Sequence, residues 1–184
     1  MTKIYYVRHG QTNYNKKVLW AGVTNTRLTE EGIKQAKKTA NDLKNIKFDV
    51  AYVSPLKRAR DTFGFVNKFH NLKPIIDVRI QERDFGDLEG KTAVEENSLV
   101  KRIELYDFKK NSSFGHKVEK ILDVDKRVRN FIEEIGKKHK NQTVLVVAHG
   151  AIARHFSAYF NGLPKNKIID KGPKNAEVLI FEKK

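Results

Sequence analysis

The sequence has 184 residues, a hydrophobic content of 39% and a formal net charge of +15 at neutral pH. This length and apolar content suit one domain with its own core, so we expect a single domain over residues 1–184. The sequence contains no cysteine, which excludes a disulfide scaffold, a thiolate nucleophile and any zinc site that needs sulfur.

The positive charge is compatible with nucleic acid, acidic membrane surfaces and anionic metabolites as partners. The basic residues are spread along the whole chain and most are lysines, which is typical of a solvated surface. We therefore predict neither a nucleic-acid partner nor a membrane partner. The first residues run directly into a predicted strand, and no apolar stretch has the length of a membrane span, so we expect a cytoplasmic protein.

Short apolar runs alternate with longer helical stretches along the chain. The first run, residues 4–7, is rich in β-branched and aromatic residues and predicts a strand. Thr29 then begins a predicted helix over residues 29–46, with acidic residues in the first turn and apolar residues at three- or four-residue spacing. Further strands are predicted at 50–53, 75–78, 144–148 and 178–181, and further helices at 56–70, 119–140 and 151–160. We expect the 119–140 helix to close with Gly136 and a basic last turn.

Strands joined by crossover helices predict an α/β fold, a three-layer α/β/α arrangement with a mostly parallel central sheet. Ligands of such sheets bind beyond the carboxyl ends of the strands. Four predicted strands end in "VRHG", "SPLKRARDT", "IQERDFGDLEG" and "VVAHGAIAR", each with ionisable side chains. We therefore expect one pocket to be surrounded by Arg8, His9, Arg58, Glu82 and His149.

The residue types in this pocket predict chemistry on a phosphoryl group. Guanidinium groups bind phosphate oxygens in a bidentate way, and helix amides after Gly10 and Gly150 would add donors. A histidine among fixed cations stays neutral, so His9 is the candidate nucleophile, with its other ring nitrogen held by a backbone carbonyl. The two arginines and His149 would align and neutralise the phosphoryl group without a metal, and Glu82 would donate and accept the protons.

From Ile4 almost to the C-terminus, the sequence resembles the histidine phosphatase superfamily, also called the phosphoglycerate mutase-like family. The segment "RHGQTNYN" matches its signature, "LTEEGIKQA" resembles its first helix, and the other three strand-end segments resemble its later motifs. The resemblance implies a phosphoglycerate mutase-like fold and transfer through a phosphohistidine at His9, with no metal or nucleotide cofactor. The residues expected to contact the substrate are Asn15, Thr12, Gly150 and Gln11.

Three departures from the family pattern favour hydrolysis over mutase chemistry. Position 11 is Gln where Glu is commoner, and Ala151 stands where the mutases carry Asn. The larger mutases also have a longer middle insertion with paired arginines, which Lys101 and Arg102 match poorly. We predict a phosphatase that hydrolyses a small phosphorylated metabolite, with phosphoglycerate mutase-type transfer as the alternative.

Several assignments stay open at this point. Asp84, Asp87 or Glu89 could be the proton donor in place of Glu82, and Thr12 and Asn15 could simply cap a helix. Residues 91–120 have no readable motif and are a candidate substrate cap. Its basic residues would suit a second anionic group on the substrate: Lys101, Arg102, Lys109, Lys110, His116 and Lys117. The substrate and the oligomeric state are not readable.

Other classes of protein fit less well. The aspartates of "ILDVDKR" follow helical spacing, which argues against an aspartate-nucleophile phosphatase, and the motifs of cyclic phosphodiesterases and metal hydrolases are absent. A nucleic-acid-binding module would explain the charge but not the acid Glu82 beside the arginines. A relative that has lost its chemistry is disfavoured because all five pocket positions are filled.

Overall fold

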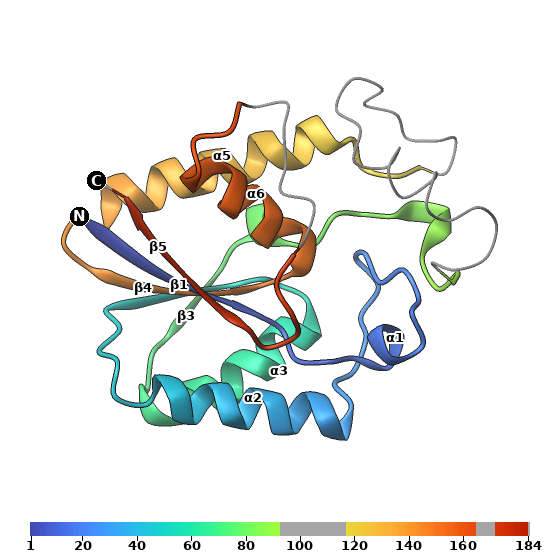
Figure 1. Ribbon diagram of the computed structural model, residues 1–184, viewed down its shortest axis with the longest axis horizontal. Coiled ribbons are helices and arrows are strands. Elements are labelled where there is room, and N and C mark those ends of the chain that lie inside the picture. Colours follow the sequence, from blue (N-terminus) through green and yellow to red (C-terminus); the bar gives the residue numbers. More distant parts are fainter. Residues whose placement is uncertain (93–116, 165–171, 184) are drawn as a thin grey trace.

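The computed structural model describes residues 1–92, 117–164 and 172–183. Within them, five strands form one sheet in the order β3-β2-β4-β1-β5. Their bounds are β1 Thr2–Arg8, β2 Val50–Val53, β3 Pro74–Ile76, β4 Thr143–Ala148 and β5 Val178–Lys183. The first four strands pair in parallel, whereas β5 runs antiparallel to β1 at the sheet edge. The two chain ends therefore lie side by side (Figure 1).

Two pairs of helices cover the two faces of the sheet (Figure 1). On one face lie α2 (Glu30–Leu43) and α3 (Lys57–Val66), and on the other lie α5 (Ile121–Lys138) and α6 (Gly150–Phe160). The described chain also has a short helix α1 (Asn13–Lys16) and the 3-10 turns η1 (Asn67–Phe69), η2 (Val78–Ile80) and η3 (Gly86–Leu88). The predicted three-layer α/β/α fold is confirmed.

The core lies on both faces of the two central strands. Alternate residues point to opposite sides of a strand, so Tyr6 and Val146 pack against α5 and α6, and Val7 and Val147 pack in the α2 and α3 layer. All four side chains are fully buried. Because both faces are covered, β1 and β4 consist of continuous apolar runs rather than alternating ones.

Two local predictions are wrong. Helix α5 has the predicted basic last turn, Lys137 and Lys138, but it runs through Gly136 instead of closing there; the Lys183 side chain of β5 lies close by, since a Cβ at Gly136 would lie 2.5 Å from its Cδ. No long helix begins after Gly10. The four-residue α1 starts at Asn13, because the Thr12 side chain caps it there.

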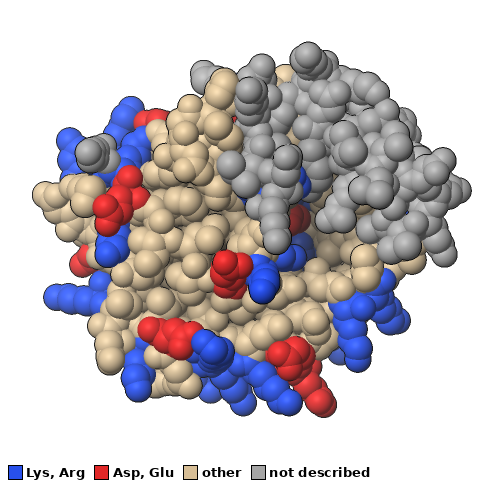
Figure 2. Space-filling view, viewed as in Figure 1, with Lys and Arg blue, Asp and Glu red and all other residues tan. Residues whose placement is uncertain are grey.

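The surface carries charges of both signs. On the face in Figure 2, lysine and arginine side chains are scattered over the visible surface, with acidic side chains among them. No described helix is both long and apolar enough to cross a membrane. Of the candidate cap at 91–120, residues 93–116 lie outside the described residues, including all its proposed substrate-binding cations except Lys117.

Candidate active site

The candidate site lies where parallel strands end at one edge of the sheet. Arg8 ends β1 and His9 follows it, while His149 follows β4 and precedes α6. The rings of His9 and His149 have their centroids 5.2 Å apart. Arg58 comes from the first turn of α3, and Glu82 lies on the segment after η2. The fold thus brings together residues from across the chain, as the sequence predicts.

His9 is held as a neutral ring with a defined tautomer. Its side chain is buried, and its Nδ1 lies 2.8 Å from the carbonyl oxygen of Gly10. Because a carbonyl only accepts, Nδ1 carries the proton and Nε2 has a free lone pair. Burial, and then the charges of Arg58 and Arg8, hold the pKa of His9 well below its usual value. The ring can therefore act as a nucleophile at neutral pH.

His149 presents a buried N–H group beside His9. Its Nε2 lies 2.6 Å from Oγ of Ser54, and that oxygen also accepts the amide of Leu56 at 3.3 Å. The Ser54 hydroxyl can donate to Nε2, and in that arrangement the neutral ring carries its proton on Nδ1. Burial and then Arg58 hold the pKa of His149 well below its usual value. In the described part of the chain Nδ1 is buried without a partner, so it can donate to a phosphoryl oxygen.

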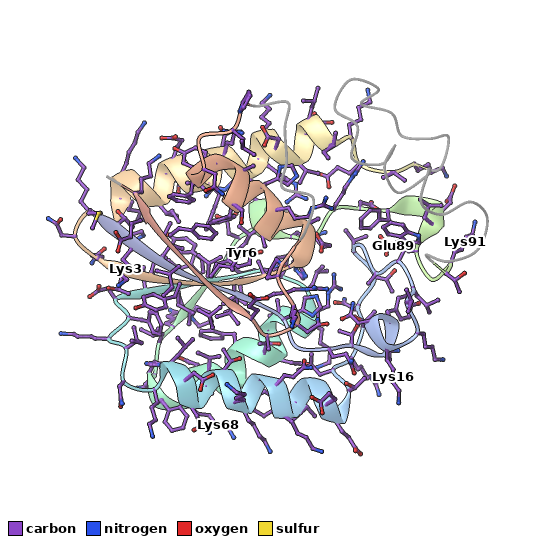
Figure 3. The ribbon with its side chains drawn as sticks, in the orientation of Figure 1. Lys3, Tyr6, Lys16, Lys68, Glu89 and Lys91 are labelled. Carbon is purple, nitrogen blue, oxygen red and sulfur yellow. The ribbon has the colours of Figure 1, made fainter. Side chains whose placement is uncertain are left out.

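Two residues around His149 were missed from the sequence. Tyr6 is labelled in Figure 3. Its hydroxyl donates to the His149 carbonyl at 2.6 Å and accepts the His149 amide at 3.0 Å. Tyr6 thereby fixes the backbone at the start of α6, which has no side-chain cap. Ser54 directly follows β2, so its position at a strand end was a signal. The sequence contained no signal for the role of Tyr6, because aromatic residues are common in buried strands.

Arg58 is buried and is held by carbonyl oxygens. Its Nη1 donates to Thr24 at 2.9 Å and its Nη2 to Gly22 at 2.7 Å. Burial lowers the pKa of Arg58 to about 10, against the opposing charges of Glu82 and Glu89, so it remains a cation at neutral pH. Its Nε is buried and has no partner among the described residues, which leaves a donor for an oxyanion.

Arg8 lies against the start of α6. Its Nη1 donates to the carbonyl of Pro173 at 2.6 Å. A Cβ at Gly150 would lie 3.3 Å from Cζ of Arg8, so the glycine lets the guanidinium approach the helix closely. The two arginines reach the pocket from different elements, which suits a ligand with several negative oxygens.

The Glu82 carboxylate sits at the N-terminus of α6. Its Oε2 accepts the amide of Ala151 at 3.3 Å, and its Oε1 accepts the amide of Arg83 at 3.0 Å. Negative charge is favourable at the positive end of a helix. The Ala151 amide, expected from the sequence to bind phosphate, is therefore used by the carboxylate instead.

Two of the three competing carboxyls, Asp84 and Glu89, are held in other contacts. Oδ1 of Asp84 accepts the amide of Gly86 at 2.7 Å, which closes a turn. Glu89 accepts hydrogen bonds from Val23, Thr24 and Phe85; although burial raises its pKa, these bonds outweigh that and lower it. Asp84 and Glu89 are therefore engaged in loop contacts, whereas Glu82 lies at the start of α6 next to His149, and this position favours Glu82 as the proton donor.

Arg127 of α5 holds the segment that carries Glu82. Its Nη1 donates to the carbonyls of Arg79 and Gln81, both at 2.7 Å, and its Nη2 donates to that of Glu82 at 3.3 Å. Glu119 fixes the guanidinium through Nε at 2.8 Å and Nη2 at 2.9 Å. The backbone on which the candidate acid depends is therefore tied to a helix of the core.

The predicted substrate-binding residues near α1 differ in what they can offer. Thr12 is buried, and its hydroxyl caps α1. Oδ1 of Asn15 accepts from the Thr12 amide and from Asn175, which leaves its Nδ2 to donate to a ligand. Oε1 of Gln11 accepts from Thr29, the cap of α2. Of these three predicted residues, Asn15 and Gln11 each keep a side-chain NH2 group that can donate to a substrate.

A cavity of about 310 Å³ adjoins the candidate acid. It is lined by side chains of both charges, namely Val23, Val78, Gln81, Glu82, Asp84, Lys117, Glu119 and Arg127. Over residues 1–92, 117–164 and 172–183, no three His, Cys, Asp or Glu side chains come together in a way that could hold a metal ion.

One known protein family matches nearly the whole chain. The family described as histidine phosphatase superfamily (branch 1) matches residues 4–184. The chain belongs to the histidine phosphatase superfamily. This membership confirms the resemblance found in the sequence motifs.

Members of the superfamily with similar sequences and structures include phosphatases and mutases. Phosphoserine phosphatase 1 of Hydrogenobacter thermophilus is 35% identical over 186 residues, which cover 98% of this chain and 86% of the relative. The structure of a mycobacterial glucosyl-3-phosphoglycerate phosphatase with VO3 has a TM-score of 0.82 at 26% identity. The match covers 97% of this chain and 91% of that chain. The structure of a phosphoglycerate mutase of Bacillus anthracis has a TM-score of 0.81 at 26% identity, and the match covers 97% of this chain and 86% of that chain. The prediction of a superfamily phosphatase is confirmed at this level, with mutase chemistry as the alternative.

Proposed function

We propose that this chain is a cytoplasmic, metal-independent phosphomonoesterase that acts on a small phosphorylated metabolite through a phosphohistidine at His9. The observation that carries the proposal is the 2.8 Å contact between Nδ1 of His9 and the Gly10 carbonyl, which leaves Nε2 unprotonated among guanidinium groups. Phosphoryl transfer asks a protein mainly for alignment and charge neutralisation.

In the first half-reaction, Nε2 of His9 forms a bond to phosphorus while the bond from phosphorus to the ester oxygen breaks. Arg8, Arg58, His149 and Asn15 hold the other phosphoryl oxygens, and Glu82 gives its proton to the departing alkoxide. In the second half-reaction, Glu82 takes a proton from a water molecule that attacks the phosphohistidine. Inorganic phosphate leaves, and His9 and Glu82 return to their starting states.

The leaving group is proposed to enter the cavity beside Glu82. This cavity has cationic and anionic side chains, which suits a leaving group that itself carries both charges. Phosphoserine, whose serine portion is an amino acid, is therefore the first substrate to test, in keeping with the name of the relative from Hydrogenobacter.

The test is a panel of phosphomonoesters assayed with excess EDTA, with kcat/KM compared between phosphoserine, phosphorylated sugars and acids, and a generic aryl phosphate. We expect release of inorganic phosphate in the chelator, with phosphoserine among the preferred substrates. Transfer of the phosphoryl group to a phosphoglycerate acceptor, with little release to water, would establish the mutase alternative instead.

A further inference from the structure

The Glu89 carboxylate accepts hydrogen bonds from the loop at residues 22–24 and from the backbone of Phe85. Oε1 accepts the amides of Val23 at 2.8 Å and Phe85 at 3.1 Å. Oε2 accepts the amide of Thr24 at 2.7 Å and also the Thr24 hydroxyl. In Figure 3, Glu89 lies where the loop before α2 meets the η3 turn. Both carboxylate oxygens are thus used to fix the loop at residues 22–24.

The same loop holds Arg58 with its acceptors. The Gly22 and Thr24 carbonyls receive the two guanidinium hydrogen bonds, at 2.7 and 2.9 Å. Amides of the loop therefore bind Glu89 while its carbonyls bind Arg58. The contact is close, because a Cβ at Gly22 would lie 1.8 Å from Oε1 of Glu89.

We propose that Glu89 is the positioning residue for Arg58: its carboxylate fixes the 22–24 loop so that the loop carbonyls aim the guanidinium at the phosphoryl group. The inference rests on the proposed function, which places Arg58 on the phosphoryl oxygens. Hydrogen bonds to the amides and carbonyls of the 22–24 loop connect the two side chains. Glu89 itself touches no reacting atom.

Charge gives the carboxylate a second effect that a neutral side chain would lack. No described acidic side chain forms a salt bridge with Arg58, and its guanidinium partners are neutral carbonyls. Burial lowers the pKa of Arg58 to about 10, while the charges of Glu82 and Glu89 oppose that shift. Removing the charge of Glu89 while keeping its shape should therefore make Arg58 lose its proton at a lower pH.

Glu89→Gln tests this proposal, because glutamine keeps the shape of the side chain but removes its charge. Its NH2 group is a donor where the carboxylate oxygen accepted hydrogen bonds, so one set of hydrogen bonds to the loop is lost. We expect kcat/KM for an aryl phosphate and the affinity for inorganic phosphate to fall together, by about 10- to 100-fold. The alkaline limb of the pH–kcat/KM profile should move to lower pH. Glu31→Gln makes the same chemical change at an exposed site of α2 and should stay within about twofold of wild type.

A double-mutant cycle with Arg58→Lys separates positioning from general structure. If Glu89 acts through Arg58, Glu89→Gln should cost less than about twofold in the Arg58→Lys background. Full additivity of the two losses, or an unchanged phosphate affinity in Glu89→Gln, overturns the proposal.

Two safeguards keep the result interpretable. Thermal unfolding checks that each variant is folded, and Thr24→Val, which removes only the hydroxyl donor, should give a smaller loss in the same direction. If Glu89→Gln does not fold, Thr24→Val provides the test: an unchanged phosphate affinity in that variant would overturn the proposal. Phosphate binding is measured by calorimetry and needs no turnover. A wild-type protein that binds phosphate but hydrolyses no ester would contradict the proposed function, and the phosphate affinities of the variants would still test the role of Glu89.

Discussion

Oγ of Ser54 lies 2.6 Å from Nε2 of His149, and a hydroxyl that donates there leaves the proton of the neutral ring on Nδ1. Removing the hydroxyl in Ser54→Ala frees the ring to place its proton on Nε2, away from the phosphoryl oxygens. We expect kcat/KM to fall by about tenfold, the value of one hydrogen bond to a charged group. Steady-state kinetics on an aryl phosphate measures the change.

Ser54→Thr keeps the hydroxyl and serves as the control for this prediction, so it should recover most of the lost activity. Equal activity of Ser54→Ala and wild type would mean that the tautomer of His149 is fixed by something other than this contact.

Tyr6→Phe should destabilise the fold by about 1–3 kcal/mol, because it leaves the amide and carbonyl of His149 buried with a lost partner. Urea unfolding measures the free energy. Tyr5→Phe is the matched control on the same strand, since the Tyr5 side chain is buried and its hydroxyl makes no hydrogen bond among the described residues. Similar losses in both variants would contradict the bridging role of the Tyr6 hydroxyl.

Glu82→Gln should slow esters with poor leaving groups far more than esters with good ones, because only a basic alkoxide needs the proton. A series of aryl and alkyl phosphates measures the dependence of kcat/KM on leaving-group pKa. Asp84→Asn should leave that dependence as in wild type. A steeper dependence in Asp84→Asn than in Glu82→Gln would assign the acid to Asp84.

Arg127→Lys should give a milder form of the same leaving-group effect, because lysine cannot reach all three carbonyls that Arg127 binds. The same ester series tests this prediction. A uniform loss for good and poor leaving groups would show that Arg127 supports the fold without aiming the acid.

Stability should fall as the pH drops below about 6.5, the ordinary pKa of histidine. His9 and His149 have pKa values well below that in the folded protein, so the unfolded chain binds protons there and the folded protein does not. The free energy of unfolding then decreases with falling pH by up to about 1.4 kcal/mol per pH unit for each ring, and these rings contribute no slope above that range. Urea unfolding between pH 8 and 5.5 measures the slope.

The double variant His9→Gln/His149→Gln lacks both rings and should show a shallower slope over the same range. An identical slope in the double variant would mean that other groups cause the acid sensitivity.

Periodicity was enough to predict the layers of the fold, and strand-end positions were enough to predict which side chains meet at one edge of the sheet. Thr29 begins α2 as its capping type predicts, and parallel strands place Arg8 and His149 at one edge because their carboxyl ends coincide. These features depend on local pattern and on topology, both of which one sequence contains.

The supporting contacts could not be read in the same way. Glu89 is adjacent in space to Val23 and Thr24 only because two loops meet, and loops have no period that predicts their contacts. Gly136 is the type of residue that ends a helix, yet α5 runs through it to Lys138, and the Lys183 side chain of β5 lies against it. Tertiary contacts of this kind override local preference.

The most direct test of the central claim is to quench the enzyme rapidly during turnover, without acid, and to look by mass spectrometry for one added phosphoryl group on the N-terminal peptide. The account predicts the adduct on His9, and it predicts neither adduct nor turnover in His9→Ala. Near-native hydrolysis by His9→Ala would contradict it.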